Sequence, residues 1–312
     1  MSTLPANDPT CLEATGDRAI ERAVELVVEG RPRAVGTITV ARLLPAVKRR
    51  MVGPFVFLDH MGPVVLDPGI GFDVRPHPHI GLSTVTYFLA GENVHRDSLG
   101  TVQVNRPGDV NVMTAGRGIV HSERADPEFR AAGGAMHGVQ IWLALPEADE
   151  DAEPSFAHHP RDTLPEVAPA PGTRGRVLFG SAFGARSPIR HPSEPVLIDL
   201  ELAAGAVIEL PADPAERAVF VIEGELAIGG DALGADHLAV LCGGRPVAIE
   251  ARSAARALVL GGPPLGPRFI EWNFVASSRE RIDRARDAWK ARQFPEIPTD
   301  RDDFIPWPED HR

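Results

Sequence analysis

The stretch Ser83-Thr-Val-Thr-Tyr-Phe-Leu89 runs into a turn at Gly91, and its composition decides the fold of the first half of the chain. Short segments rich in β-branched and aromatic residues, bounded by turn residues, are typical of β-strands. On either side of it, residues 36–44 and 139–143 alternate between apolar and polar side chains, as half-buried strands do. Helical periodicity is almost absent between residues 36 and 145. We therefore predict a β-sandwich or β-barrel there, and not a doubly wound α/β sheet.

A second β region follows, and a length of 312 residues favours two domains. Residues 1–30 are predicted to be an N-terminal arm that either adds a strand to a barrel or stays loose; within it, residues 19–28 fit a helix or a strand. The first β domain spans residues 31–148. The acidic, proline-rich stretch 149–175 is predicted to be a linker or inter-barrel loop. Residues 176–312 then form the second β domain, followed by a C-terminal helix and a tail.

The C-terminal helix is the clearest helical signal in the chain. Ser277 and Glu280 have the spacing of a capping box at a helix start. Ile282, Ala285 and Trp289 then recur at positions i, i+3 and i+7, so they share one face. We expect this helix to pack across a barrel with that face.

Composition narrows the class of protein. A net charge of −11 argues against a phosphate-binding surface, so we expect no direct nucleic-acid partner. The two cysteines, Cys11 and Cys242, lie far apart in sequence, which makes a disulfide framework unexpected and favours two free thiols in a reducing compartment. The sequence contains neither a secretory leader nor an apolar run of about 18 residues, so we expect no membrane partner and a cytoplasmic location.

Two short motifs carry the chemistry. His77 and His79 lie two residues apart in one predicted strand, and His121 and Glu123 do so in another. Residues i and i+2 of a strand point to the same side, so the four side chains can converge if the strands face one another. Three imidazoles and a carboxylate suit one divalent transition metal and leave two octahedral positions open. From spacing alone, a metal site and a set of polar side chains at a barrel mouth both remain open.

The motifs also resemble a known family, the pirins. The resemblance is dense over residues 36–145 and looser afterwards, where Val221-Ile-Glu-Gly-Glu-Leu226 and Trp272-Asn-Phe-Val-Ala-Ser277 match best. The matching blocks follow in the expected order: Arg49-Arg-Met-Val-Gly-Pro-Phe-Val-Phe-Leu-Asp-His-Met-Gly-Pro63, Arg75-Pro-His-Pro-His-Ile-Gly-Leu82, Thr84-Val-Thr-Tyr87, His95-Arg-Asp-Ser-Leu-Gly100, Arg106-Pro-Gly-Asp109, Met113-Thr-Ala-Gly-Arg-Gly-Ile-Val-His-Ser-Glu123 and His137-Gly-Val-Gln-Ile-Trp142.

The resemblance implies an all-β bicupin, that is, two cupin-type β-barrels with a C-terminal helix. It implies a single metal in the N-terminal cupin, held by His77, His79, His121 and Glu123. The metal implied is Fe(II), with Mn, Ni, Co, Cu and Zn as alternatives. The second barrel has no His-x-His before Val219, so we expect it to bind no metal.

Several pirin relatives resemble quercetin 2,3-dioxygenases, which implies a dioxygenase that acts on a flavonol-like or other enolic or phenolic substrate with O2. Glu123 would then be the catalytic residue, accepting a hydroxyl proton from the substrate. Other pirins are described as regulators, so the alternative is a metal-dependent protein that binds transcription factors or metabolic enzymes without catalysis. A purely structural metal is a third option, which the open coordination positions disfavour. Pirins are usually monomers, so a monomer is expected.

Other candidates have weaker signals. For His95, a surface hydrogen bond is the favoured interpretation and a position behind a metal ligand is the alternative. His60, which follows Asp59, is predicted to be structural, and His137 is a candidate for lining the pocket. Ser83 and Thr84 are expected to give the pocket a polar edge. The run from Gly116 to His121 lacks the third glycine and the helix of a nucleotide-binding loop, so we reject that function for it.

Overall fold

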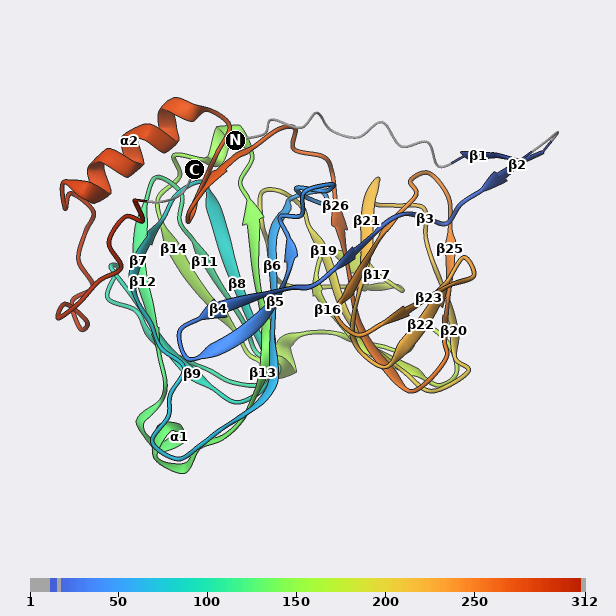
Figure 1. Ribbon diagram of the computed structural model, residues 1–312, viewed down its shortest axis with the longest axis horizontal. Coiled ribbons are helices and arrows are strands. Elements are labelled where there is room, and N and C mark those ends of the chain that lie inside the picture. The colour runs from blue at the N-terminus through green and yellow to red at the C-terminus, as the bar shows by residue number, and fades with distance from the viewer. Residues whose placement is uncertain (1–11, 16–17, 310–312) are drawn as a thin grey trace.

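The computed structural model describes residues 12–15 and 18–309, which form two β-barrels side by side (Figure 1). Each barrel consists of one seven-stranded and one four-stranded sheet. Strands dominate both halves and nearly all pairings are antiparallel, as the alternating sequence pattern predicts. The all-β prediction is therefore confirmed.

The N-terminal barrel holds the two histidine motifs. Its seven-stranded sheet has the order β14-β11-β8-β13-β6-β5-β4, and its four-stranded sheet has the order β10-β9-β12-β7. The bounds are β4 Arg31–Val35, β5 Ile38–Leu44, β6 Phe55–Leu66, β7 Val74–His79, β8 Leu82–Ala90, β9 Asn93–Asp97, β10 Val102–Asn105, β11 Val110–Thr114, β12 Ile119–Arg124, β13 Gly134–Ala144 and β14 Ser155–His159.

The C-terminal barrel repeats this arrangement with sheet orders β15-β16-β19-β26-β21-β24-β3 and β20-β25-β22-β23. Alanine, valine, isoleucine and leucine side chains fill its interior. The bounds are β3 Val24–Glu29, β15 Glu166–Val167, β16 Thr173–Phe179, β19 Val196–Leu202, β20 Val207–Leu210, β21 Glu216–Glu223, β22 Glu225–Ile228, β23 Asp231–Gly234, β24 His237–Leu241, β25 Val247–Ala251 and β26 Ala255–Gly262. Small hairpins lie outside the two barrels: β1 Leu12–Thr15 with β2 Arg18–Glu21, β17 Ser181–Ala182 with β18 Ala185–Arg186, and β27 Phe269–Glu271 with β28 Phe274–Ala276.

The two seven-stranded sheets pack against each other through one continuous apolar cluster. Val139 and Ile141 contribute from the first barrel, and Phe220 and Leu258 contribute from the second. All four side chains are essentially inaccessible to solvent. Burial on this scale makes the barrels one cooperative unit, because separating them would expose a full apolar sheet face.

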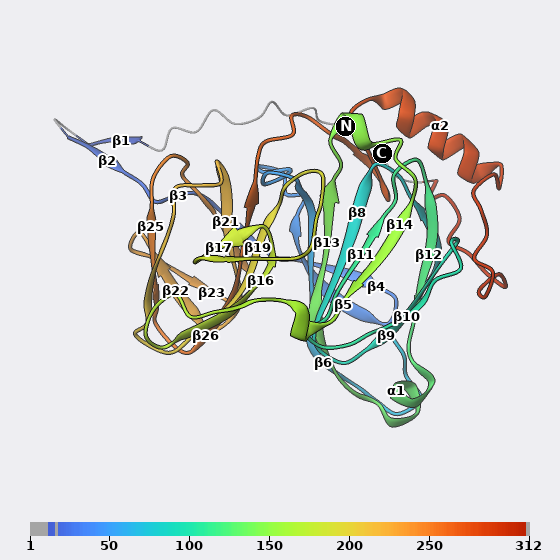
Figure 2. The ribbon, with the colours of Figure 1, turned by 180° about the vertical axis from the view of Figure 1, so that it is seen from behind.

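The strand pairings show which barrel the segments at both ends of the chain, and the stretch between the barrels, belong to. Strand β3, inside the predicted arm, pairs with β24 and completes the sheet of the C-terminal barrel. In the predicted linker, β14 pairs with β11 of the first barrel and β15 pairs with β16 of the second. Residues 269–307, predicted to belong to the second domain, pack on the first barrel instead (Figure 2). The domain boundaries themselves stay a prediction, but these pairings show which barrel each segment joins.

Helix α2 spans Arg279–Lys290 and covers the N-terminal barrel with the predicted face, since Ile282, Ala285 and Trp289 are all buried. The predicted capping box is wrong. The backbone N–H and hydroxyl of Ser277 both donate to the carboxylate of Glu150, at 2.7 and 2.9 Å, and the N-cap residue is one position later. A buried carboxylate from a distant loop thus outcompetes the local cap.

A short helix that we did not predict, α1, spans Pro127–Ala132. Asp126 caps it by accepting from two backbone N–H groups, and Pro127 occupies the first turn. An Asp-Pro start is a recognisable signal, but six residues are too few to show periodicity.

Cys242 is disulfide-bonded, so the expectation of a free thiol is wrong for this residue. Cys11 lies outside the described residues. Within the described part of the chain, none of the helices has the length and apolar character needed to cross a membrane.

Replacing Gly116 by alanine is expected to destabilise the protein by roughly 2–4 kcal/mol, because a Cβ would add overpacking to a left-handed backbone. Gly116 has φ +51°, and a Cβ there would lie 1.9 Å from the carbonyl oxygen of Ala152. Gly100→Ala is the matched control, since φ is +88° and nothing lies within 4 Å. Urea unfolding should show the larger loss for Gly116→Ala, and equal losses would contradict this explanation.

Candidate metal centre

Three histidines from two neighbouring strands converge inside the N-terminal barrel. Strands β7 and β12 pair antiparallel with His121 opposite His77 and Ile119 opposite His79. One ligand atom from each of the three histidines lies within 4.8 Å of the others, and all three side chains are buried. The Nε2 atoms of His79 and His121 are 3.1 Å apart. The i, i+2 rule therefore predicted the convergence of these three residues correctly.

Backbone carbonyls orient two of the three rings. The Nδ1 atom of His77 lies 2.8 Å from the carbonyl oxygen of Arg75. The Nδ1 atom of His79 lies 3.1 Å from the carbonyl oxygen of Asn273, in the turn between β27 and β28. A carbonyl only accepts, so each Nδ1 must carry the proton, which leaves each Nε2 lone pair free.

The third ring is oriented by a chain of side chains that ends on a carboxylate. His95 Nε2 lies 3.0 Å from the carboxylate of Asp97, and His95 Nδ1 lies 3.4 Å from Nδ1 of His121. If Nε2–H of His95 donates to Asp97, its Nδ1 is free to accept from His121. His95 is buried against Phe156 and is therefore not at the surface, so the favoured interpretation was wrong. The alternative, a position behind a metal ligand, stays a prediction.

Burial keeps all three histidines in the neutral form that a metal requires. It lowers the pKa of His77 to about 4 and that of His79 and His121 well below the ordinary value; His77 lowers the pKa of the other two further. Neutral imidazoles whose ring nitrogens converge within 4.8 Å of one another fit a transition-metal ion. The donor set present thus agrees with the implied metal.

Asp97→Asn should weaken metal binding roughly 10–100-fold, the usual effect of removing a partner behind a ligand. Burial opposes ionisation of Asp97, but hydrogen bonds from His95 and Thr101 bring its pKa below the ordinary value. An amide can donate to His95 and reverse the tautomers along the chain to His121. Competition with a chromophoric chelator measures the change in Kd. Asp199→Asn is the control, a carboxylate equally buried but bonded to Tyr87 and Arg256, and it should leave the metal Kd unchanged. An unchanged Kd in Asp97→Asn would contradict the proposed tautomer chain.

Glu123 lies in the same cavity, but its carboxylate does not join the cluster of ligand atoms. Its Oε1 is 3.8 Å from Nδ1 of His121, the ring nitrogen directed away from the cluster. The pairing of β12 with β7 is irregular between His121 and Glu123, which shifts the two side chains relative to each other. Its role as a fourth ligand therefore stays a prediction.

Relative to Glu123→Gln, the metal-free wild-type protein should lose stability as pH rises between about 4.5 and 8, because burial raises the pKa of Glu123 to about 8. Between pH 4.5 and 8 the folded state keeps a proton on Glu123 that the unfolded state has released. The contribution of this proton to the free energy of unfolding is therefore full below pH 4.5 and is lost as pH rises through 8. Glu123→Gln carries no such proton. Urea unfolding of both metal-free proteins across this pH range measures the difference, and parallel profiles would refute this assignment.

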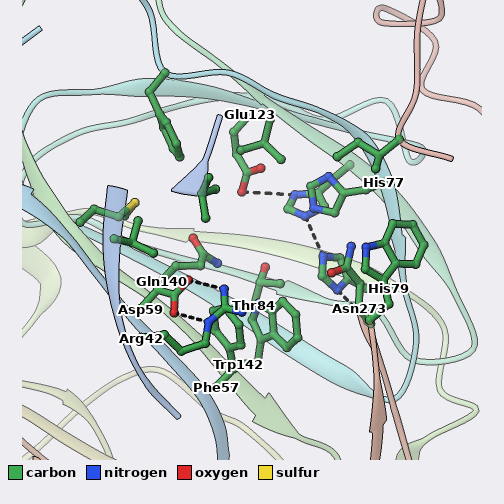
Figure 3. A pocket seen from close by; sticks show the side chains of 18 of the residues that line it. Arg42, Phe57, Asp59, His77, His79, Thr84, Glu123, Gln140, Trp142 and Asn273 are labelled. Atoms are coloured by element: carbon green, nitrogen blue, oxygen red, sulfur yellow. Dashed lines mark hydrogen bonds and ion pairs between the residues drawn. The ribbon is translucent and has the colours of Figure 1, made fainter. Parts of the chain in front are cut away.

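A cavity of about 460 Å³ opens beside the triad, within the usual size range of small-molecule sites (Figure 3). Phe57 and Trp142 stack at 3.9 Å and form an aromatic wall, and Trp142 also meets the ring of His79 edge-on. Trp142 is buried and also lines this cavity. At the other end of the cavity, Arg42 makes a bidentate ion pair with Asp59.

Other candidates lie elsewhere. Thr84 lines the cavity, but Ser83 points to the opposite side and contacts Thr114 and His191, so only half of the expected polar edge exists. His60 and His137 face the second barrel, so the candidate role of His137 in lining the pocket is wrong. Sequence reasoning missed Arg42, Phe57 and the carbonyl of Asn273. Arg42 could have been found in the sequence, because it is a charged residue inside an otherwise apolar strand. The carbonyl of Asn273 could not, because every residue has a backbone carbonyl.

Comparisons with known proteins agree with this geometry. The family model described as Pirin matches residues 37–143, and the model described as Pirin C-terminal cupin domain matches residues 197–295. A pirin-like protein of Caulobacter vibrioides is 44% identical over 288 residues, which cover 92% of this chain and 100% of that protein. A crystal structure of quercetin 2,3-dioxygenase from Acinetobacter baumannii has a TM-score of 0.84 and 36% identity, covering 91% of this chain and 94% of that one. The Escherichia coli pirin YhhW, solved with nickel(II), has a TM-score of 0.60 at 17% identity over 77% of this chain and 99% of that one, a likeness of fold alone.

Proposed function

The chain belongs to the pirin family, and on that basis we propose that it is a metal-dependent dioxygenase of the quercetin 2,3-dioxygenase type. The substrate would be a flavonol or another planar enol or phenol, and the second substrate would be O2. One observation carries the proposal: one ring nitrogen from each of the three histidines lies within 4.8 Å of the others beside a cavity of about 460 Å³, and the three are not sealed in a packed core. Catalytic metal sites keep such open positions, and structural ones do not.

Fe(II) is the proposed metal, with Mn, Ni, Co, Cu and Zn as alternatives. His77, His79 and His121 would hold the ion. Glu123, whose Oε1 lies 3.8 Å from Nδ1 of His121, would be the fourth ligand. When bound, the ion would supply Lewis acidity to the substrate oxygens and redox coupling to O2.

The chain's own residues then have defined tasks. Phe57 and Trp142 offer a flat apolar surface on which an aromatic ring can lie. The carboxylate of Glu123 accepts the proton of the substrate hydroxyl next to the carbonyl, which leaves an electron-rich enolate. The apolar surface of Phe57 and Trp142 would limit the access of water to this anion. Ring opening of a flavonol with O2 would release carbon monoxide.

The test begins with protein purified without chelators and loaded anaerobically with Fe(II). Loss of quercetin absorbance on addition of O2, together with released carbon monoxide, would support the proposal. One bound metal per chain without turnover of any enol or phenol tested would refute it.

The alternative is a metal-dependent regulator that binds transcription factors or metabolic enzymes. The cavity beside the triad favours catalysis, because a regulator needs no enclosed space next to its metal. A protein partner, a monomeric state and a cytoplasmic location all stay predictions.

A further inference from the structure

A second pair of imidazoles lies on the opposite face of the same barrel. His60 on β6 and His137 on β13 belong to adjacent strands of the seven-stranded sheet, and both point toward the C-terminal barrel. Their Nε2 atoms are 2.9 Å apart, and both side chains are buried. In the triad, His79 and His121 bring their Nε2 atoms to 3.1 Å in the same manner.

Carboxylates of the other barrel face the Nδ1 atoms of this pair. Asp236 Oδ1 lies 2.6 Å from Nδ1 of His60, and Glu223 Oε1 lies 3.6 Å from Nδ1 of His137. Asp236 adopts φ +60° and is anchored by backbone hydrogen bonds with Gly30 and Val221. Asp236 accepts from Nδ1 of His60, which leaves the lone pair of His60 on Nε2; Glu223, at ion-pair distance, favours the same tautomer for His137. This is the arrangement that carboxylates impose on metal-binding histidines.

The two rings are not expected to share an additional proton. Burial lowers the pKa of His137, and His60 lowers it further. Phe220 meets the ring of His60 edge-on at 5.3 Å, so apolar contacts also surround the pair. Because the carboxyl groups of Asp236 and Glu223 are about half exposed, the pair nevertheless lies close to solvent that could complete a coordination shell.

We propose that His60 and His137 bind a second divalent transition-metal ion, of the Cu(II) or Ni(II) type, at the junction of the two barrels. Metal–nitrogen bonds of about 2.05 Å and a nitrogen separation of 2.9 Å give an angle of about 90° at the metal. That angle fits neighbouring ligands of an octahedral or tetragonal ion. A tetrahedral ion would need the nitrogens about 3.3 Å apart, and a linear ion about 4 Å apart. Water molecules fill the remaining positions.

The ion would link the barrels. Its two ligands come from the first barrel, and the carboxylates that orient them come from the second. Occupancy of this site should therefore raise the unfolding temperature of the whole protein, independently of the triad.

Titration with Cu(II), followed by electron paramagnetic resonance, tests the proposal. The wild type should bind two ions per chain, and His121→Ala should keep one, whose signal shows coupling to two imidazole nitrogens. His60→Gln and His137→Gln should each lose that ion and keep the triad ion. His191→Gln is the matched control, an imidazole between the barrels whose ring nitrogens hydrogen-bond to Ser83 and Ser193, and it should keep both ions.

Asp236→Asn provides a test that keeps both ligands and changes a side chain that is about half exposed. It should weaken the second ion roughly 10–100-fold and leave the triad ion unchanged. A wild-type protein that binds a single ion would overturn the proposal, because the two rings would then share only a hydrogen bond. So would a second ion that survives in both His60→Gln and His137→Gln, since it would be adventitious. Neither result bears on the dioxygenase function, which depends on the triad.

Discussion

His121→Ala is expected to lower metal affinity by well over 100-fold. Replacing one of three converging imidazoles removes a direct bond to the ion, so the loss should exceed the 10–100-fold effect typical of partners behind the ligands. His121 also forms the link between the triad and the His95–Asp97 pair. Its removal therefore eliminates a ligand, and it also leaves His95 and Asp97 with no ligand to orient.

Thermal unfolding with and without Fe(II) measures this loss without any assay of activity. A ligand at 1,000 times its Kd stabilises a protein by about 4 kcal/mol. Wild-type protein should show the corresponding rise in Tm, and His121→Ala should show almost none. His158→Ala is the control, a histidine bonded to Asn111 on the outer strand β14, and it should respond like the wild type. A full metal-dependent shift in His121→Ala would mean that the triad is not the binding site.

Glu123→Gln should lower kcat by roughly 100- to 10,000-fold, the range of general acid–base catalysis, while one metal ion per chain remains bound. The three histidines cluster without Glu123, so they can hold the ion without it. Glutamine keeps the shape of the side chain but cannot accept the substrate proton. The comparison therefore separates a role in chemistry from a role in holding the metal.

Steady-state kinetics with the Fe(II)-loaded proteins, alongside metal analysis, provides the readout. Glu150→Gln is a suitable control, because Glu150 is an equally buried glutamate outside the cavity that contacts Ser277 and Arg268. It should lose stability and retain kcat per bound metal. Unchanged turnover in Glu123→Gln would remove Glu123 from the mechanism, whereas loss of the metal would show that its main role is ligation.

The sequence predicted the parts of the site that depend on strand geometry. His77 and His79, and then His121, obey the alternation of a strand, and the resemblance to pirins supplied the pairing of the two motifs. The carbonyl of Asn273 could not be predicted, because any residue has one and only the packing of residues 269–307 on the first barrel places it beside His79. His95 was misjudged since burial is a tertiary property that a turn-flanked histidine does not reveal.

The fold, like the site, depends on tertiary contacts that could not be predicted from the sequence. Strand β3 has the composition of a strand, but nothing in residues 24–29 identifies β24, more than 200 positions away, as its partner. His60 and His137 are single histidines in separate strands, and they become a pair only through the pairing of β6 with β13. Long-range pairing therefore accounts for most of what the sequence left open.

The exchange of terminal segments between the barrels has a consequence for dissecting this protein. A cut in the crossing near residues 160–165 would leave β3 attached to the fragment that has no β24 to pair with. The other fragment would carry away the Asn273 carbonyl, and with it the hydrogen bond that orients His79. An autonomous metal-binding half would have to be assembled by transplanting residues 269–307 onto the first barrel and deleting β3. For the same reason, recombination that exchanges one barrel as a contiguous block of sequence would produce two incomplete barrels. The sequences of the two halves are therefore constrained to evolve together.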